Sequence, residues 1–179
     1  PTAMVVDSAT TFKISNPINI YGSFIGTETN IDQRDIVANP TTLSGDLNSD
    51  DIPNDFSVNK GDNVQHVIVV DSLIGATITI DGFVLSGGNS SANTQGANEF
   101  FYRGGGIFSY STVNIKNCIF SQNFAGSGAG VYISPLGGSG NDSSFEGCTF
   151  SNNSTSSQSA GIFLFGLDNI LIDDCTFSN

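Results

Sequence analysis

One short acidic stretch carries oxygen-bearing side chains at alternate positions, a spacing that can bind a metal ion. Residues 45–55 read Gly-Asp-Leu-Asn-Ser-Asp-Asp-Ile-Pro-Asn-Asp. Such a loop can wrap Ca²⁺, which takes roughly 6–8 oxygen ligands in proteins. The candidate ligands are Asp46, Asn48, Asp50, Asp51 and Asp55. The stretch lacks the Gly and the bidentate Glu of a full EF-hand loop, so a solvated acidic loop is the alternative to a structural Ca²⁺ site.

A second stretch places three consecutive aromatic residues beside a cation. These residues are Phe100, Phe101, Tyr102 and Arg103. An aromatic platform with an adjacent charge suits a sugar ring or a protein partner. The alternative is that Phe100 and Tyr102 anchor the loop that carries them onto the body of the protein.

The groups that cleave polysaccharides are sparse in this chain. A hydrolase needs two carboxylates that flank the scissile bond, and a uronate lyase needs a basic residue together with Ca²⁺. Asp173 and Asp174 are an adjacent carboxylate pair at a polar corner of a repeat, and His66 is the single histidine, with no Cys nearby in sequence. We therefore expect a corner role for the pair and a packed or surface position for His66, rather than a catalytic role for either.

The charge balance and the hydropathy pattern exclude two classes of partner. Seventeen Asp and Glu face five Lys and Arg, which gives a formal net charge of −12. Phosphate backbones and anionic lipids would repel such a chain. No apolar run approaches the roughly 20 residues of a membrane-spanning helix. We expect neither nucleic-acid binding nor membrane insertion, and the Pro1-Thr2 start is typical of a mature or excised segment.

A sequence repeat in the second half of the chain indicates the β-strands that position the candidate residues. An apolar-x-apolar-x-x-apolar-x-apolar unit starts at Ile78, Val113 and Ile170, and a further copy has Ser143 at its first position. Each unit predicts two short strands around a two-residue polar corner. The repeats are anchored by Ile80, Ile115, Phe145 and Ile172.

A small-residue motif alternates with this unit and predicts a third strand. It reads Gly-Gly-Gly-Ile at 104–107, Gly-Ala-Gly-Val at 128–131 and Ser-Ala-Gly-Ile at 159–162. Three strands per coil without helical periodicity predict an all-β parallel β-helix, a solenoid in which equivalent residues stack. The expected ladders are Phe120, Phe150 and Phe177 inside, and Asn123 and Asn153 at a corner.

Cys118, Cys148 and Cys175 also take equivalent positions, so stacking would form a column of thiols. Neighbouring Cα atoms about 4.8 Å apart fall in the disulfide range. Parallel Cβ vectors oppose a bridge, however, and we expect buried free thiols that pack as small apolar groups. Because three is an odd number, at least one thiol is free or paired with another molecule.

The first half is less regular than the second. Strands are expected within 12–14, 18–24 and 64–70, with a long polar excursion at 27–62. We therefore expect one domain over 1–179, with irregular opening coils in 1–75 and regular repeats in 76–179. An excursion this long requires a functional or capping role.

These motifs resemble known repeat families. The tetrapeptides at 104–107 and 128–131 and the Phe-x-x-Asn at 120–123 and 150–153 resemble right-handed parallel β-helix repeats of bacterial surface proteins, particularly polymorphic outer-membrane proteins. The segments 20–24, 26–29, 33–35, 39–46 and 81–83 are similar to the opening coils of large secreted β-helix proteins of Bacteroidetes-like bacteria. The resemblance implies a right-handed solenoid in an extracellular or cell-surface protein and implies no particular activity.

Two functions follow as hypotheses. The first is an extracellular structural or adhesive segment whose partner is a glycan, a cell-surface protein or a copy of itself. The second is a carbohydrate-binding or pectate-lyase-like β-helix, which requires carboxylates, or an Arg with Ca²⁺, converging on one sheet face. Because residues 175–179 fall inside a repeat, we expect the last coil to continue in a larger parent protein or to be covered by another copy, head to tail, in a filament.

Overall fold

The computed structural model describes residues 11–73, 75–90, 102–136 and 140–178 of the 179-residue chain. Within these ranges the regular elements are β-strands, apart from the 3-10 helix η1 (Ile31–Gln33). The strands form four sheets, and every strand pair is parallel. No helix in the described ranges is long and apolar enough to cross a membrane.

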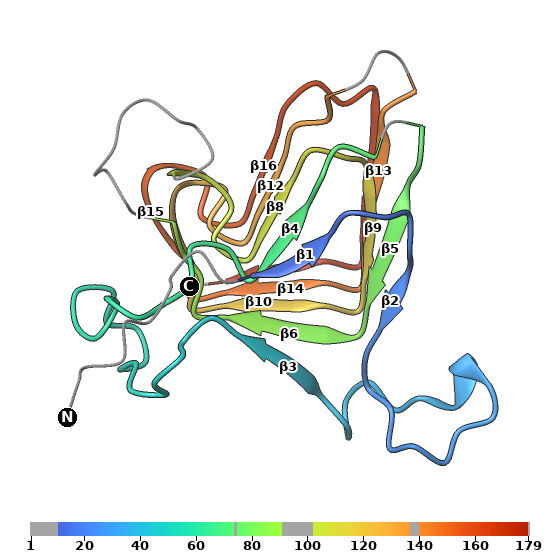
Figure 1. Ribbon diagram of the computed structural model, residues 1–179, viewed down its shortest axis with the longest axis horizontal. Coiled ribbons are helices and arrows are strands. Elements are labelled where there is room, and N and C mark those ends of the chain that lie inside the picture. The colour runs from blue at the N-terminus through green and yellow to red at the C-terminus, as the bar shows by residue number, and fades with distance from the viewer. Residues whose placement is uncertain (1–10, 74, 91–101, 137–139, 179) are drawn as a thin grey trace.

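We name the sheets A to D, and Figure 1 shows them as the sides of the molecule. Sheet A contains β1 (Phe12–Ile14), β4 (Ile68–Val70), β8 (Ile107–Ser109), β12 (Val131–Ile133) and β16 (Ile162–Leu164). Sheet B contains β2 (Ile20–Tyr21), β5 (Ile78–Asp81), β9 (Val113–Lys116), β13 (Asp142–Glu146) and β17 (Asn169–Asp173). Sheet C contains β3 (Thr41–Ser44), β6 (Phe83–Ser86), β10 (Ile119–Ser121), β14 (Thr149–Ser151) and β18 (Thr176–Ser178). Sheet D contains β7 (Asn89–Ser90), β11 (Phe124–Ser127) and β15 (Ser154–Gln158).

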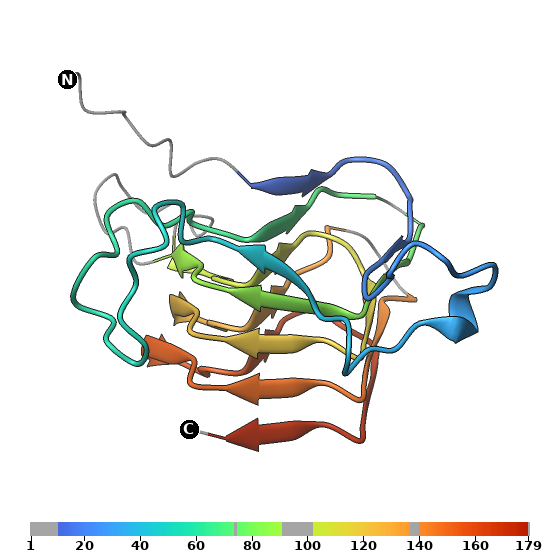
Figure 2. The ribbon, with the colours of Figure 1, turned by 90° about the horizontal axis from the view of Figure 1, so that it is seen from below.

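From β5 onward the chain visits sheets B, C, D and A in turn, and we call each such passage a round. Each strand pairs with its counterpart one round earlier, so the strands of sheet C lie one beside the next in Figure 2. The sequence pattern predicts three strands per coil, and this number is wrong because sheet D adds a fourth. Its strands are rich in Ser, Thr and Gly, so they carry no apolar alternation that could reveal them.

The anchor residues of the repeats occupy one column of sheet B. Ile80 aligns with Ile115, Ile115 with Phe145, and Phe145 with Ile172. Ile80, Ile115 and Phe145 are fully buried. Burial of a large apolar side chain contributes about 1.5–3 kcal/mol, so each round adds stability to the same continuous core.

The polar corners between sheets B and C need a left-handed residue in every round. The second corner residue has a positive φ at Gly82 (79°), Asn117 (49°), Gly147 (62°) and Asp174 (49°). Gly adopts this conformation without a steric cost, and Asn and Asp adopt it more readily than other side chains. This preference explains the choice of residues at a position that otherwise varies from round to round.

The first half contains shorter strands than the sequence pattern predicts. The expected strand at 18–24 is reduced to β2, and the expected strand at 64–70 is reduced to β4. Val64 instead lies at the level of sheet D, where its N–H donates to the Gly45 carbonyl and its carbonyl accepts from the Asn89 N–H. The polar excursion is interrupted by β3, which pairs with β6 from Thr41 to Ser44.

The two remaining parts of the excursion flank the outer face of sheet C, as Figure 2 shows. Residues 22–40 are held by Arg34, whose guanidinium donates to Asp81 at 2.7 Å and to the Gly22 carbonyl at 3.1 Å. Residues 45–62 are held on the other side by paired hydrogen bonds of 2.8 and 2.9 Å between Asn54 and Gln122. Both loops therefore lie along the flanks of later rounds.

Candidate functional site

The predicted phenylalanine residues form a column inside sheet C. The rings of Phe120 and Phe150 stack with centroids 4.8 Å apart and planes 5° apart, and Phe150 stacks on Phe177 with centroids 4.8 Å apart. Phe120 is fully buried, Phe150 is 2% exposed and Phe177 is 53% exposed. The column therefore begins in the core at Phe120 and ends at Phe177, whose ring is half exposed to solvent.

The two predicted asparagines form a buried amide ladder at the corner between sheets C and D. The Asn123 amide nitrogen donates to the Leu85 carbonyl at 3.0 Å and to the Asn153 Oδ1 at 3.1 Å, and its own Oδ1 accepts from the Gly88 N–H. The Asn153 amide nitrogen donates to the Phe120 carbonyl at 2.8 Å. Each amide thus supplies the hydrogen bonds that this turn of the backbone cannot make for itself.

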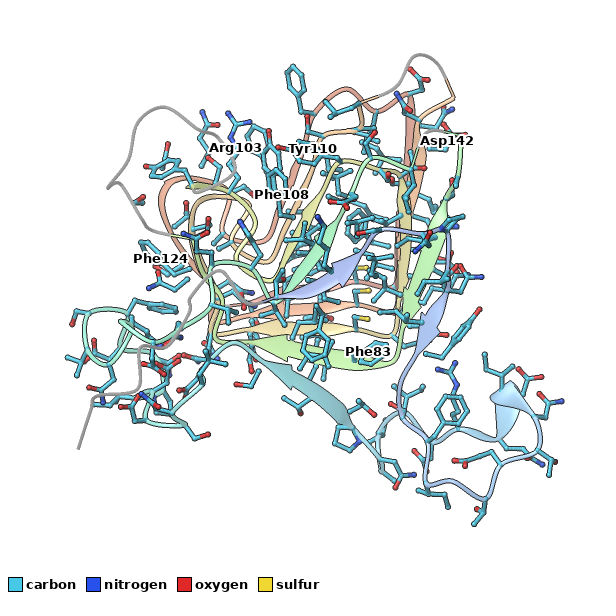
Figure 3. All side chains as sticks on the ribbon, in the orientation of Figure 1. Phe83, Arg103, Phe108, Tyr110, Phe124 and Asp142 are labelled. Carbon is cyan, nitrogen blue, oxygen red and sulfur yellow. The ribbon has the colours of Figure 1, made fainter. Side chains whose placement is uncertain are left out.

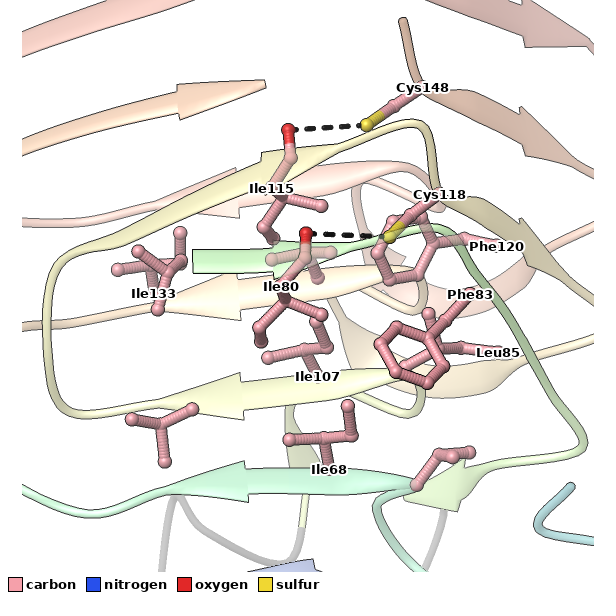
Figure 4. Close-up of a cluster of buried hydrophobic side chains, with 14 of the residues drawn as sticks. Ile68, Ile80, Phe83, Leu85, Ile107, Ile115, Cys118, Phe120, Ile133 and Cys148 are labelled. Carbon is pink, nitrogen blue, oxygen red and sulfur yellow. Dashed lines mark hydrogen bonds between the residues drawn. The ribbon is translucent and has the colours of Figure 1, made fainter. Parts of the chain in front are cut away.

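The three cysteines form the predicted column and are free thiols. Figure 4 shows Cys118 and Cys148 donating to the carbonyls of Ile80 and Ile115, at 3.6 and 3.5 Å. Cys175 donates in the same way to the Phe145 carbonyl at 3.5 Å. Burial raises the pKa of the Cys118 thiol and raises that of Cys148 to about 12. These two thiols are protonated and shielded, which is unfavourable for nucleophilic or metal-binding chemistry.

The acidic loop brings together three of its four candidate carboxylates. Oxygen atoms of Asp46, Asp50 and Asp51 lie within 4.8 Å of one another. The predicted ligand Asp55 is engaged elsewhere, because its carboxylate accepts from the Ser57 N–H and hydroxyl. The backbone N–H of the predicted ligand Asn48 donates to Asp62 at 2.8 Å, a contact that does not involve its side chain.

Two of the three clustered carboxylates already have protein partners. Asp46 accepts from the backbone N–H groups of Asp50 and Asp51 at 3.2 and 3.1 Å. One oxygen of Asp51 lies 2.7 Å from Lys60 Nζ, and its other oxygen is buried without a hydrogen bond. Partial desolvation, together with the nearby charges of Asp62, Asp46 and Asp51, raises the pKa of Asp50. Ca²⁺ binding at this loop stays a prediction.

The described half of the aromatic stretch packs onto the protein, and Phe100 and Phe101 lie outside the described residues. The Tyr102 ring lies directly over Gly126, where an added Cβ would collide with it, and its hydroxyl lies 3.1 Å from Ser156 Oγ. The Arg103 guanidinium lies over the Tyr132 ring, 4.8 Å from its centroid, and donates to the Tyr132 hydroxyl.

An outward-facing aromatic column on sheet A was missed by the sequence analysis. Phe108, Tyr132 and Phe163 align on adjacent strands, with ring centroids 5.5 and 5.2 Å apart and nearly parallel planes. Phe108 and Tyr132 are nearly fully buried, and Figure 3 shows Arg103, Phe108 and Tyr110 on the same side of the molecule. The signal was an aromatic residue after the first apolar residue of each small-residue motif, at 107–108, 131–132 and 162–163.

The predicted structural roles of His66 and of the Asp pair fit their positions. His66 is buried, with Nδ1 2.8 Å from the Gly104 carbonyl and its ring 5.3 Å from that of Phe108. Asp174 is the left-handed corner residue, and Asp173 continues the outer column of sheet B.

That outer column is a ladder of charged side chains. Asp81, Lys116, Glu146 and Asp173 align on four adjacent strands. Asp81 is paired with Arg34 at 2.7 Å, and Glu146 is paired with Lys116 at 3.0 Å. Two of the three carboxylates in this column are therefore neutralised by cations, an arrangement that favours structural ion pairs over an acid and base pair.

A groove of about 560 Å³ lies between the loop at 36–40 and the outer face of sheet C. Its floor contains Val84, Ile119 and Thr149, and its wall contains Ile36, Val37 and Pro40. This is a mainly apolar surface, and carboxylates are absent from the residues that line it.

The last strands of sheets B and C present their inner columns to solvent. Ile170, Ile172 and Phe177 face inward in register with buried residues, yet they are 46%, 48% and 53% exposed. They are exposed because no strand lies on the far side of β17 and β18 in the described structure.

The fold and these surfaces define an all-β chain of stacked parallel sheets, with a continuous core and polar loops on its flanks. Comparisons with protein-family models, with curated proteins and with solved structures find no significant match.

Proposed function

We propose that this chain is a segment of a right-handed parallel β-helix that serves as an extracellular structural or adhesive rod in a bacterial surface or secreted protein. The observation that carries the proposal is the unbroken register of the inner columns. The sheet B column joins Ile20 to Ile172 through five strands, and the sheet C column joins Leu43 to Phe177. Such one-dimensional stacking yields a stiff rod whose loops can vary without disturbing its core.

The charged groups support a scaffold more than a catalyst. The Arg34 and Asp81 side chains are only 8% and 9% exposed, and the same Asp81 accepts from Asn117 at 2.9 Å. An ion pair held in this way fastens the loop at 22–40 to the sheets. A carboxylate committed to such a pair is not available to protonate or attack a substrate.

A carbohydrate-binding role is the second candidate, and the groove beside Ile119 is the observation that favours it. Ile119 is 41% exposed and Val37 is 91% exposed, so apolar surface is available to the face of a sugar ring. A glycan retained here without being cleaved would fit an adhesive rod as well.

The extracellular assignment is tested by labelling cells of the source organism with an antibody against the chain. Labelling of intact cells, lost after protease shaving, is the expected result. Labelling that requires permeabilised cells would overturn the assignment.

The structural role is tested by incubating the purified chain with neutral and acidic polysaccharides. We expect no new reducing ends and no unsaturated uronate products, and cleavage would overturn the structural role. Retention of a glycan that is lost in Ile119→Asp, but kept in Leu136→Asp, would establish the carbohydrate-binding candidate. Leu136 is a matched control because it is 58% exposed and lies outside the groove.

A further inference from the structure

We infer that the Lys60 amine and the Asp51 carboxylate condense to an intramolecular amide bond, so that the loop at 45–62 closes covalently on itself. Lys60 Nζ lies 2.7 Å from an oxygen of the Asp51 carboxylate. The inference goes beyond the proposed rod and does not depend on it. It rests on the seclusion of this pair, on the hydrogen bonds that fix its backbone, and on the groups around the Asp51 carboxylate.

The pair of Lys60 and Asp51 is far more secluded than the ion pairs of the other lysines. The side chains of Lys60 and Asp51 are 10% and 14% exposed. The side chains that form the ion pairs of Lys13 and Lys116 are 35–57% exposed. The Lys60 ammonium also lies 5.5 Å from the centroid of the Phe56 ring. Such seclusion favours condensation, because both ions lose solvation and the water that would compete with the amine is kept out.

Hydrogen bonds fix the backbone at both ends of the pair. The Asp51 N–H donates to the Asp46 carboxylate at 3.1 Å. The Lys60 carbonyl accepts from the Asn89 side-chain amide at 3.0 Å. Between them, the Asn59 side-chain amide donates at 2.7 Å to the carbonyl of the residue before Asp51. Groups held in this way react without a bimolecular encounter, and well-oriented intramolecular reactions reach effective molarities of about 10⁵–10⁸ M.

The two oxygen atoms of Asp51 lie in different surroundings. Oδ2 accepts from the Asn63 amide at 2.9 Å as well as facing Lys60 Nζ. Asn63 is 3% exposed, and it is anchored by a second hydrogen bond of 2.7 Å to the Gly87 carbonyl. Oδ1 is buried and makes no hydrogen bond within the described residues. Oδ2 is therefore placed to hold the negative charge of a tetrahedral intermediate, and Oδ1 is the oxygen that leaves.

The reaction balances without an oxidant, a reductant or a cofactor. The Lys60 ammonium passes one proton to Asp51 Oδ1, and the electron pair freed on Nζ forms a bond to Cγ. Collapse of the tetrahedral intermediate breaks the bond between Cγ and Oδ1, which takes a second proton from Nζ and leaves as water. Asp46 and Asp50 can relay this proton, because their carboxylates and that of Asp51 have oxygen atoms within 4.8 Å of one another. One ammonium and one carboxylate thus become one amide and one water.

The amide would close a ring from residue 51 to residue 60 beside the strands of sheet C, where Figure 2 shows this loop. The same ring contains Asn54, which is bound to Gln122 of sheet C and its corner at 2.8 and 2.9 Å. A covalent ring stabilises mainly by restricting the unfolded chain. The loop would therefore keep its place on the flank of the sheets when the surrounding hydrogen bonds open.

The mass of the intact chain tests the inference. We expect the folded chain, kept in a calcium chelator, to weigh one water molecule less than its sequence. The chelator is included because a metal ion on the Asp51 carboxylate would compete with the Lys60 ammonium. After denaturation and chymotryptic cleavage at Phe56, the fragments that carry Asp51 and Lys60 should remain joined. A full sequence mass in a chain whose circular dichroism shows the β fold would overturn the inference.

A matched pair of variants locates the lost water. Lys60→Arg keeps the positive charge beside Asp51 but replaces the amine by a guanidinium that stays protonated, so this variant should have its full sequence mass. Lys116→Arg makes the same change in an exposed ion pair and should still lose one water molecule. Loss of water that persists in Lys60→Arg would place the dehydration elsewhere, for example in a succinimide at Asp81, and would overturn the inference.

Discussion

The Cys148 thiol donates a hydrogen bond to the carbonyl oxygen of Ile115, one round earlier in the chain, at 3.5 Å. Cys118 and Cys175 make the equivalent bond to Ile80 and Phe145. Each thiol therefore ties the start of a sheet C strand to the sheet B column of the preceding round. This is a structural use of cysteine, in which the proton on sulfur has to be kept.

The first prediction concerns high pH. The unfolded Cys148 thiol ionises near its ordinary pKa of 9.0, whereas the folded thiol keeps its proton up to a pKa of about 12. The unfolded state therefore binds fewer protons between these values, and the free energy of unfolding falls as the pH rises through this window. The Cys148 contribution is at most about 1.4 kcal/mol per pH unit and vanishes below the window. Urea unfolding should show a weaker alkaline dependence in Cys148→Ala, and equal pH slopes for the two proteins would contradict this.

The second prediction concerns the aromatic column. Phe150→Ala removes the ring that stacks on both Phe120 and Phe177, and we expect it to cost about 3–5 kcal/mol of the free energy of unfolding. Thr149→Ala, the outward neighbour on the same strand, should cost far less. Chemical denaturation measures both changes. Similar losses would mean that the column adds little to the core.

The third prediction concerns the Arg34 and Asp81 ion pair. Arg34→Met leaves the buried Asp81 carboxylate without its cation, and removal of one partner of such a pair costs about 3–5 kcal/mol. We also expect faster proteolytic cleavage within 22–40, because Arg34 holds that loop. Lys116→Met breaks an ion pair whose side chains are 37% and 38% exposed, and it should cost about 0–1 kcal/mol. Unchanged cleavage in Arg34→Met would show that other contacts hold the loop.

The fourth prediction concerns the acidic loop. If Asp46, Asp50 and Asp51 bind Ca²⁺, added Ca²⁺ should raise the melting temperature and chelation should lower it. Asp46→Asn combined with Asp50→Asn should abolish the response, and Asp55→Asn should retain it, because Asp55 is engaged by Ser57. Calorimetry measures the binding itself. If the melting temperature of the unmodified chain does not respond to Ca²⁺ or to chelation, the calcium prediction is wrong, and the partner of the Asp51 carboxylate is Lys60.

The inner columns could be predicted because period-2 alternation fixes which residues face inward. The inward positions of Ile80, Ile115 and Ile172 are indicated by the apolar residue two positions before each of them. The position of Phe145 is indicated by its distance to Phe150, which equals the distance from Ile115 to Phe120. Sheet D could not be predicted in this way, since Ser154–Gln158 is held by backbone hydrogen bonds and contains no apolar residue.

Contacts between distant residues were beyond the reach of a local pattern. Arg34 and Asp81 are 47 residues apart, and Asn54 and Gln122 are 68 residues apart. Each pair is formed only once the loops have folded against the sheets. Of the acidic loop, the pattern of alternate oxygens found the residues that cluster, but it could not show that Asp46 accepts from the backbone of its own loop.

The shared register of Phe120 and Phe150 has a consequence for how this chain can change in length. The two residues occupy interchangeable positions in adjacent rounds, so joining Phe120 directly to Ser151 would remove one whole round and keep every remaining side chain on its face. Loss of a single residue within a strand would instead turn all the following side chains of that strand to the wrong face. The unit of viable insertion or deletion in the sheets is thus a complete round, and duplication of a round would lengthen the stack without disturbing its columns.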